Sequence, residues 1–556
     1  MILERYTINS VRCVMLVWLV VTMFVAGCGG GGGGGGGEGD GEGGVGGGVS
    51  GSDWTVMVYL DGDNNLEGAA LADFNEMEAA MSSLNMKVVV LFDRSRSNSR
   101  EQGDWAETRL YEVKHDTNPS SIDSKRLSDT TWLGLNGDED DELNMGSGET
   151  LRNFVTFCKE TYPAGHTALI LWDHGSGWAP ASPDSAYSDT KFIAIDDGSA
   201  GDALSLKEVA AALEGQNVDL LGFDACLMAE AEVAWELRHS ARYMVASEGL
   251  EPSTGWSYTN FINQFNQLPV AEKTPQKLAR SIADTYMADA TSGTEVTLSV
   301  VDLTKLAPLG EAVDALALEM ADLGPNAVTT ARYATTCYNE NTCVDLRQFA
   351  GTLGVSSATL DTLDAALSQS VIYKVATTPE NACGLSIYFP VFGYTAGQFL
   401  DYTPATLAFA QETRWAKALK SYSENAFYYT FETVEGSSGL DTQLDLYTDS
   451  LIFIAGNDDI SALSEFSALR IPVAKGASYG LRVSSPGSFW HAGTLGSYGV
   501  YAGTGRATPC APIAEAGDTH EPDDGPANAS ILDPEIVQSH FLSGGDVDWV
   551  YVTVPE

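Results

Sequence analysis

A histidine and a cysteine occupy positions in this chain where they could form a nucleophile and its base. His174 follows the apolar run 168–172 (ALILW), and Cys226 follows the apolar run 218–223 (VDLLGF). Ligands collect at the carboxyl ends of strands in open parallel sheets, so we expect both residues at one edge of a sheet. An imidazole there could take the proton of the thiol and later deliver it to a leaving group, which is what a cysteine nucleophile requires.

The surroundings of the two side chains favour this interpretation over a structural one. Taken alone, Cys226 would be a small buried hydrophobic residue and His174 a loop histidine. Both residues nevertheless stand at a strand end, with Gly175 or Ala225 beside them. A helical pattern that begins just after Cys226 would also place the thiol near the positive end of a helix dipole, which favours the thiolate.

Two such strand ends require a parallel sheet, and the sequence from about residue 54 predicts one. Nearly continuous apolar runs are typical of strands that helices cover on both faces, and here they alternate with helical patterns. The apolar runs are 54–60, 87–92, 168–172 and 218–223, and the helical patterns are 66–81, 149–161, 204–213 and 227–237. We therefore predict an α/β fold over residues 53–422, with a mostly parallel sheet flanked by helices.

The character of the sequence changes near residue 425. Segments in which apolar and polar residues alternate, such as 427–431 (FYYTF) and 479–483 (YGLRV), are separated by turns of Gly, Asn, Asp and Ser. This pattern is typical of a small antiparallel β-sandwich. We predict an accessory β-sandwich domain at residues 425–505 and a partial second β module at residues 515–556.

Residues 1–28 have the features of a targeting segment. The apolar run 13–25 is too short for a membrane-spanning helix of about 20 residues. It leads into Val-Ala-Gly-Cys28, which resembles a bacterial lipobox and implies cleavage before Cys28 and lipidation of its thiol. A Gly-rich tether at residues 29–52 follows. We predict an exported protein, lipid-anchored to a bacterial envelope membrane at the outer membrane or cell surface. An ordinary secretory signal or a short anchor is the alternative.

The composition excludes several classes of protein. With 30 Lys and Arg against 76 Asp and Glu, the formal net charge of −46 argues against a nucleic-acid partner. A hydrophobic content of 44% argues against global disorder. Eight cysteines in 556 residues are too few for a scaffold built on disulfides. Export would permit disulfides, and Cys337 and Cys343 are close enough in sequence to pair.

Four stretches of the chain resemble the clostripain family of cysteine endopeptidases. They are 143–178, which contains HGSGW, 223–229 (FDACLMA), 246–258 and 384–390 (GLSIYFP). The resemblance covers roughly residues 54–420, and it implies a caspase-like fold and cleavage of peptide bonds after basic residues. Caspases carry their histidine about 50 residues before the cysteine, and here 226 − 174 = 52. The C-terminal region resembles bacterial pre-peptidase C-terminal domains.

The resemblance assigns roles to the residues that match the family's motifs. His174 matches the catalytic base and Cys226 the nucleophile, and the backbone N–H groups of Gly175 and Cys226 would hold the oxyanion. Asp224 matches the acidic residue of the specificity pocket, a carboxylate partner for a substrate Arg or Lys. The sequence offers no third member of a triad, and we expect Asp173 to close the turn rather than to orient the imidazole.

Members of this family often mature by cutting their own chain between the histidine and cysteine strands. Lys191 lies in such a segment, among polar and small residues that are typical of an exposed loop. We therefore expect self-cleavage after Lys191.

The resemblance requires no cofactor for the chemistry, but it leaves a calcium requirement open because some relatives depend on calcium. The run 61–67 (DGDNNLE) spaces oxygen atoms at alternate positions, although its length and glycine placement do not match an EF-hand. A turn leading into a capped helix explains the same residues. The run 138–142 (DEDDE) is typical of a solvated loop, so the metal ligands stay unassigned.

These observations favour a surface-anchored cysteine endopeptidase that cuts after Arg or Lys through the pair of Cys226 and His174. Its partners would be protein or peptide substrates and, through Cys28, a membrane. The alternative is a non-catalytic surface binding or adhesion protein that keeps the peptidase fold. A metal-dependent hydrolase is a weaker alternative, because the sequence contains no His-x-x-x-His or comparable ligand spacing.

Overall fold

The computed structural model describes residues 52–555 with gaps. The residues left out inside this range are 82–84, 97, 104, 129, 137–140, 179–192, 291–293, 339–341, 391–401, 404–405, 436–441, 458–466, 485–495, 505–522, 524 and 543–546. All statements about structure below refer to the described residues.

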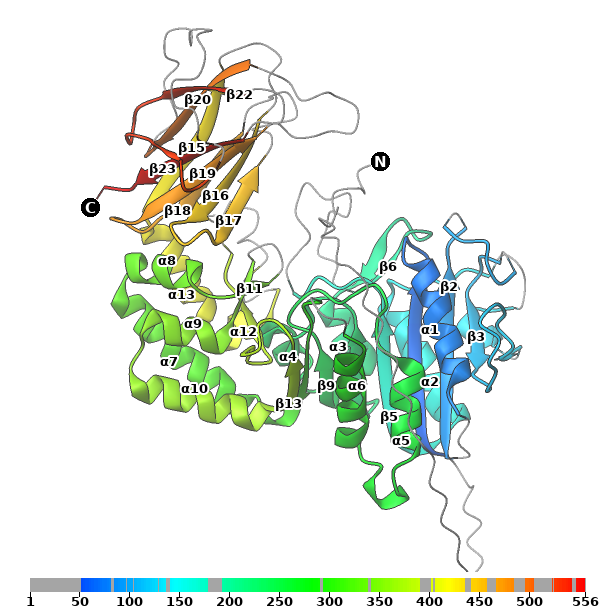
Figure 1. The fold of residues 1–556 in the computed structure, drawn as a ribbon. Coiled ribbons are helices and arrows are strands. Elements are labelled where there is room, and N and C mark those ends of the chain that lie inside the picture. Colours follow the sequence, from blue (N-terminus) through cyan, green and yellow to red (C-terminus); the bar gives the residue numbers. More distant parts are fainter. Residues whose placement is uncertain are drawn as a thin grey trace, which may run out of the picture. The chain divides into compact units, whose positions relative to one another are not determined.

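A nine-stranded sheet forms the centre of the region before residue 425 (Figure 1). Its strand order is β13-β10-β9-β8-β5-β1-β2-β3-β4. The middle strands, from β9 to β2, pair in parallel, and the outer strands pair antiparallel. The strands are β1 (Ser52–Gly62), β2 (Met86–Arg94), β3 (Arg109–Glu112), β4 (Lys125–Arg126), β5 (Ala164–Trp172), β8 (Val218–Asp224), β9 (Ala241–Ala246), β10 (Thr297–Asp302) and β13 (Val371–Ala376). The predicted α/β fold with a mostly parallel sheet is confirmed.

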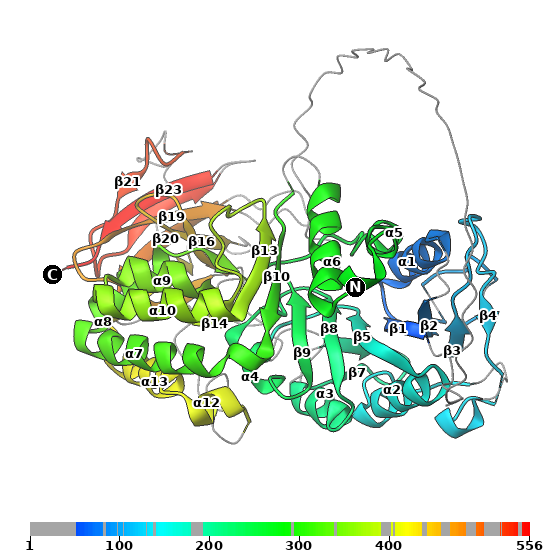
Figure 2. The same cartoon turned by 90° about the horizontal axis from the view of Figure 1, so that it is seen from below.

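Helices cover both faces of this sheet because its central strands are apolar on both sides. In β1, Tyr59 packs into one hydrophobic core and its neighbour Leu60 into the other. Figure 2 shows one group of helices on each face. One face carries α1 (Glu67–Ala79), α5 (Tyr258–Asn266) and α6 (Pro275–Asp289); the other carries α2 (Gly148–Thr161), α3 (Leu206–Leu213) and α4 (Ala231–Glu236).

Further helices and two small sheets complete this region. The two cysteines that were expected to be able to pair, Cys337 and Cys343, are both free thiols here, although they lie on adjacent strands. The helices are α7 (Ala307–Leu323), α8 (Pro325–Tyr333), α9 (Leu346–Leu353), α10 (Ser357–Ser370), α12 (Ala408–Glu412) and α13 (Trp415–Asn425). The small sheets are β6 (Ile193–Asp196) with β7 (Asp202–Leu204), and β11 (Cys337–Tyr338), β12 (Cys343–Asp345) and β14 (Ser386–Tyr388).

The C-terminal region is all β, as predicted, and consists of two sheets around one apolar core. The four-stranded sheet has the order β18-β15-β20-β22, and the five-stranded sheet has the order β17-β16-β19-β23-β21. The strands are β15 (Tyr428–Glu435), β16 (Gln443–Thr448), β17 (Phe453–Asn457), β18 (Ala468–Pro472), β19 (Ser478–Ser484), β20 (Gly496–Gly503), β21 (Ser530–Ile531), β22 (Gln538–Leu542) and β23 (Val547–Thr553).

The prediction of a partial second module at residues 515–556 is wrong. β22 pairs with β20, and β23 pairs with β19 along its whole length. Val550 and Val552 of β23 are buried in the same core as Leu481 of β19. The last strands therefore complete the sandwich that begins at β15, because they supply apolar residues and ladder partners that its sheets lack. The resemblance to pre-peptidase domains is not confirmed.

The N-terminal predictions fall outside the described residues. These include Cys28, the signal segment and nearly all of the Gly-rich tether, and Lys191 is also outside. Among the described residues, no helix has both the length and the apolar character that crossing a bilayer would need.

Candidate active site

The pairing of β5 with β8 brings the two sequence-predicted reactive residues together. The strands are parallel, and Trp172 is the partner of Asp224. His174 and Cys226 each follow two residues after this pair. The N–H of Asp173 also donates to the carbonyl oxygen of Asp224 over 3.4 Å. Since paired strands lie about 4.8 Å apart, both residues leave the sheet on neighbouring strands at the same level.

Gly175 packs directly against the turn that carries the thiol. A Cβ at position 175 would overlap the carbonyl oxygen of Cys226 and lie 3.2 Å from its backbone nitrogen. Only glycine allows the loop after β5 to approach this closely. The two residues predicted to hold the oxyanion are therefore neighbours through their backbones, whereas their role in binding an oxyanion stays a prediction.

Cys226 lies in a turn, not at the start of a helix. The next helix, α4, begins only at Ala231, so the prediction that a helix dipole favours the thiolate is wrong. Burial raises the pKa of the Cys226 thiol, and the nearby Asp224 raises it further. The backbone N–H of Glu251 donates to Sγ over 3.2 Å and partly offsets this effect. The free thiol is consequently neutral near pH 7.

The imidazole of His174 contacts an asparagine that sequence reasoning did not assign to the site. Its Nε2 lies 2.8 Å from Oδ1 of Asn65, which is 109 positions earlier in the chain. Burial lowers the pKa of His174, so the neutral ring is favoured at pH 7. A neutral imidazole and a neutral thiol are suited to exchange the proton during attack rather than before it.

Asp173 closes the loop around His174, as expected. Its Oδ1 accepts a hydrogen bond from Nδ2 of Asn64 over 2.7 Å, and its Oδ2 accepts one from the backbone N–H of Ile195. Burial raises the pKa of Asp173 to about 8. The carboxyl group therefore joins three chain segments, and its described hydrogen bonds do not go to the imidazole.

Asp224 lies buried beside the thiol, together with two carboxyl groups that the sequence did not reveal. Its oxygens accept hydrogen bonds from the hydroxyl of Tyr258 over 2.9 Å and from the backbone N–H of Trp256 over 3.2 Å. A Cβ on Gly255 would lie 3.1 Å from Asp224 Oδ1 and 2.9 Å from Oδ2 of Asp73. We call Asp73, Asp224 and Glu251 the pocket carboxylates.

Burial is the main cause of the raised pKa values of the pocket carboxylates. Burial raises the pKa of Asp224 to about 7. Burial and then the charge of Asp224 raise the pKa of Asp73 and that of Glu251 well above their usual values. Trp172 donates through Nε1 to Asp73 over 2.6 Å. Because like charges in one site oppose ionisation, a nearby cation would stabilise the ionised form of the cluster.

The carboxyl group of Glu230 holds the HGSGW segment through a hydrogen bond to its backbone. Its Oε2 accepts the N–H of Trp178 over 2.8 Å, and a Cβ on Gly177 would overlap its carboxyl group. Cys343 donates its thiol proton to Oε1 over 2.9 Å. Burial raises the pKa of Glu230 to about 8, with Glu232 adding to the effect. This buried carboxyl group therefore holds the segment that follows His174.

A second carboxylate cluster lies at the ends of neighbouring segments. Its ligand oxygens lie within 4.8 Å of one another, and it comprises Asp63, Asp93, Glu142 and Asp196, which we call the loop carboxylates. Burial raises the pKa of Glu142 to about 7. Oδ2 of Asp93 is buried and accepts no hydrogen bond from the described residues. Oxygen-only donor sets of this kind suit hard cations such as calcium.

The run 61–67 does not act as one calcium loop. Of this run only Asp63 belongs to the loop carboxylates, and Glu142 joins them from the acidic run 138–142, of which residues 138–140 lie outside the described part of the chain. Three other side chains of the run have separate partners: Asn64 binds Asp173, Asn65 binds His174, and Glu67 forms a fully buried ion pair with Arg94 at 2.7 Å. The sequence could not show this division, because the partners lie far away along the chain.

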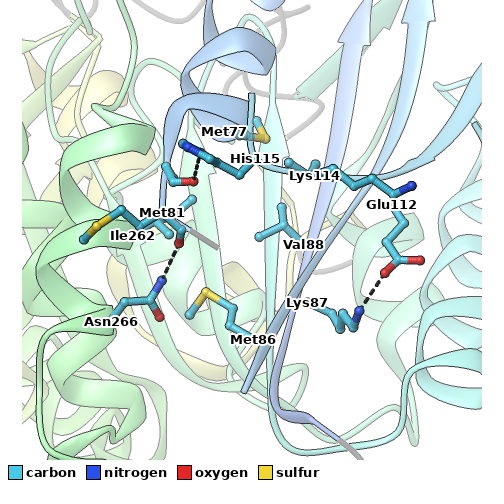
Figure 3. A pocket seen from close by; sticks show the side chains of 12 residues that line it. Met77, Met81, Met86, Lys87, Val88, Glu112, Lys114, His115, Ile262 and Asn266 are labelled. Atoms are coloured by element: carbon cyan, nitrogen blue, oxygen red, sulfur yellow. Dashed lines mark hydrogen bonds and ion pairs between the residues drawn. The ribbon is translucent and has the colours of Figure 1, made fainter. Parts of the chain in front are cut away.

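A cavity of about 620 Å³ lies next to Met86, at the opposite end of β2 from Arg94 (Figure 3). Lys87 pairs with Glu112 at its wall over 2.6 Å. The residues that line this cavity include neither His174 nor Cys226. The cavity is therefore separate from the candidate active site.

Comparison with known proteins gives the family of the chain. A sequence model of the Clostripain family matches residues 58–422, which is more than half of the 556 residues. The chain belongs to the Clostripain family. This match confirms the resemblance that the sequence motifs indicated.

Individual relatives either match a smaller part of the chain than the family model does or have a low sequence identity. Clostripain of Hathewaya histolytica is 35% identical over 230 residues, which are 38% of this chain and 41% of that protein. The chain thus spans about two fifths of the length of this curated relative. A secreted C11 cysteine protease from Bacteroides thetaiotaomicron, solved with an irreversible peptide inhibitor, is 21% identical with a TM-score of 0.48, and the match covers 66% of this chain and 99% of that one. An inactive C11 zymogen from Parabacteroides distasonis is 22% identical, with the same TM-score and coverage.

Replacing Gly175 with alanine should impair catalysis more than folding. The new methyl group would push the His174 loop away from the Cys226 turn, and displacements of about 1 Å can cost about 100-fold in rate. We expect a loss of that order in kcat/KM on a peptide substrate. Gly68→Ala is the matched control, since a Cβ there meets nothing within 4 Å. Equal activity of the two variants would contradict the close approach.

Proposed function

We propose that this chain is a cysteine endopeptidase that hydrolyses peptide bonds after Arg or Lys. The observation that carries the proposal is the pairing of β5 with β8, which puts His174 and Cys226 two residues beyond one paired position. Membership of the Clostripain family supports the class of enzyme. The buried carboxyl groups beside the thiol support the preference for basic residues.

In the proposed reaction, the thiol proton passes to His174 as Sγ of Cys226 attacks the substrate carbonyl carbon. The new C–S bond forms while the carbonyl oxygen becomes an oxyanion. The backbone N–H groups of Gly175 and Cys226 would donate to this oxyanion. His174 then gives its proton to the leaving amine as the C–N bond breaks. Water, deprotonated by the same imidazole, finally hydrolyses the thioester.

The pocket carboxylates supply the proposed selectivity. An Arg or Lys side chain that enters beside Asp224 would replace the repulsion among the carboxyl groups by charge-assisted hydrogen bonds. Tyr258 and the Trp256 N–H hold Asp224 in place for this contact. An acidic or apolar side chain would gain nothing from these groups and would leave them buried without a cation.

A panel of fluorogenic peptides ending in Arg, Lys or Asp tests the proposal directly. We expect cleavage after Arg or Lys, loss of activity with a thiol alkylator, and none in Cys226→Ala. Cleavage after Asp alone would refute the role of Asp224. If no peptide is cut under reducing conditions, with or without calcium, the alternative of a non-catalytic binding or adhesion protein is favoured.

Binding of a basic group should tighten as the pH rises through about 7. Burial raises the pKa of Asp224 to about 7, so the carboxylate that pairs with a guanidinium forms only above that pH. The inhibition constant of arginine amide should therefore fall between about pH 6 and pH 8. Citrulline amide, which has the same α-amino group but a neutral side chain, serves as the control and should lack the part of this trend that comes from the side chain. A trend that persists unchanged in Asp224→Asn would contradict the assignment.

Calcium is a fitting occupant of the loop carboxylates. The oxygens of these four carboxyl groups lie within 4.8 Å of one another, so a cation would offset their repulsion when they are ionised, and Asp93 Oδ2 is buried with no described donor. We propose that Asp63, Asp93, Glu142 and Asp196 would hold the ion. It would supply positive charge that holds the run 61–67 in place. No step of the reaction requires it.

Calcium should raise the melting temperature of the protein. At 100 times its dissociation constant, a ligand stabilises the folded state by about 2.7 kcal/mol, so we expect a shift of several degrees relative to chelated protein. Asp93→Asn should abolish the shift. Asp322→Asn, an exposed change on α7, is the control and should keep it. Equal melting temperatures of the wild type with and without calcium would rule out the site.

Maturation and anchoring are the remaining proposals. We infer self-cleavage after Lys191 because this basic residue lies between the histidine and cysteine strands, where a basic-specific peptidase could cut its own chain. The Cys226→Ala protein should then remain a single full-length band, and a two-chain product would show that another protease cuts. We also infer export and lipid anchoring through Cys28, which the lipobox-like sequence supports.

A further inference from the structure

We propose that Asn65 is a positioning residue of the catalytic pair. Its Oδ1 would accept the Nε2–H of His174, fix the tautomer of the ring, and leave Nδ1 to take the proton of Cys226. The observation is the 2.8 Å contact between Nε2 and Oδ1. The inference rests on the proposed Cys226–His174 chemistry, and it adds a third member to a pair for which the sequence offered none.

The chemistry of the two groups determines the direction of this hydrogen bond. An amide oxygen can only accept a hydrogen bond, so Nε2 must carry the proton. A neutral imidazole has one N–H, and Nδ1 is then the unprotonated nitrogen. Nδ1 is therefore the ring nitrogen that would act as the base.

The loop that carries Asn65 is fixed on the side that precedes this residue. Asn64 donates through Nδ2 to Asp173 over 2.7 Å and to the carbonyl oxygen of Ile195 over 3.1 Å. The Oδ1 of Asn64 accepts the N–H of Leu66 over 2.8 Å, so the chain is tied across Asn65 itself. Helix α1 starts directly afterwards, at Glu67. Asn65 thus presents its amide from a rigid support, as an orienting residue should.

The contact should grow stronger during the reaction. When Nδ1 takes the thiol proton, the ring becomes positively charged and Nε2–H becomes a charged donor, which forms stronger hydrogen bonds. Burial opposes this charge, since it lowers the pKa of His174. The amide oxygen of Asn65 would offset part of that cost and so stabilise the thiolate–imidazolium form.

Alkylation of Cys226 by iodoacetamide tests the proposal without any substrate, so it is independent of the Arg or Lys preference. The rate at neutral pH reports the thiolate fraction, and peptide mapping assigns the modified cysteine. We expect Asn65→Ala to lower this rate and to lower kcat by about 10–100-fold with little change in KM. Asn65→Asp keeps an acceptor and adds negative charge, so it should raise the alkylation rate above that of the wild type.

If residue 65 accepts the Nε2–H hydrogen bond, the alkylation rate should be highest in Asn65→Asp, intermediate in the wild type and lowest in Asn65→Ala. The other ionisable groups around the pair are Asp173 at the end of β5, Asp224 at the end of β8 and Glu251 beside the thiol, and all are unchanged in these variants. Asn118→Ala, an exposed change between β3 and β4, is the control and should match the wild type. Because the Asn65 side chain is exposed, the variants should fold with nearly the same melting temperature.

Two results would overturn the proposal. Equal slowing in Asn65→Ala and Asn65→Asp would show a purely structural role, and unchanged alkylation in both would show no role. His174→Ala separates this failure from a failure of the proposed function. If its loss leaves the reactivity of Cys226 unchanged, the Cys226–His174 pair itself is wrong.

Discussion

The in-register parallel pairing of β5 with β8 is the constraint on which the rest of the site depends. The ladder places Trp172 opposite Asp224, and the reactive residues follow at equal distances along each strand. Because side chains alternate along a strand, a shift of one residue would turn one of the two partners to the other face of the sheet. The hydrophobic cores on both faces of the sheet hold this register. Gly175 lets the loop after β5 contact the Cys226 turn, and this contact requires the same register. The placement of His174 and Cys226 therefore follows from backbone hydrogen bonds within the sheet.

The same edge of the sheet collects carboxyl groups that the fold alone would not favour. Burial raises the pKa values of Asp73, Asp224 and Glu251 next to Cys226, and those of Asp63, Asp93 and Glu142 among the loop carboxylates. Burying like charges together destabilises a protein unless a cation joins them. Such local conflicts in an otherwise consistent fold are typical of functional sites. Under the proposed function, the cation would be a basic side chain in the first cluster and a calcium ion in the second.

The sequence predicted those features that depend on neighbours in the chain. Apolar runs such as 168–172 and 218–223 identified the central strands, and the motifs around His174 and Cys226 identified the family. It did not predict contacts made across long separations, such as that of Asn65 with His174, because no local pattern encodes them. The helix expected just after Cys226 was wrong because the chain first makes a turn, with Leu227 at a positive φ, before α4. The second β module was wrong because strand patterns do not reveal which sheet a strand joins.

The way the β-sandwich closes affects how the chain can be divided. β22 and β23 come last in sequence, yet each pairs with an earlier strand. β22 pairs with β20 at the edge of one sheet, and β23 lies between β19 and β21 in the other. A polypeptide cut after β20 would leave the backbone of β19 and β20 without these ladder partners, and exposed strand edges promote association with other chains. A fragment that ends at residue 505 would thus tend to associate through its exposed strand edges. A shortened form should either retain all residues through β23 or end before β15.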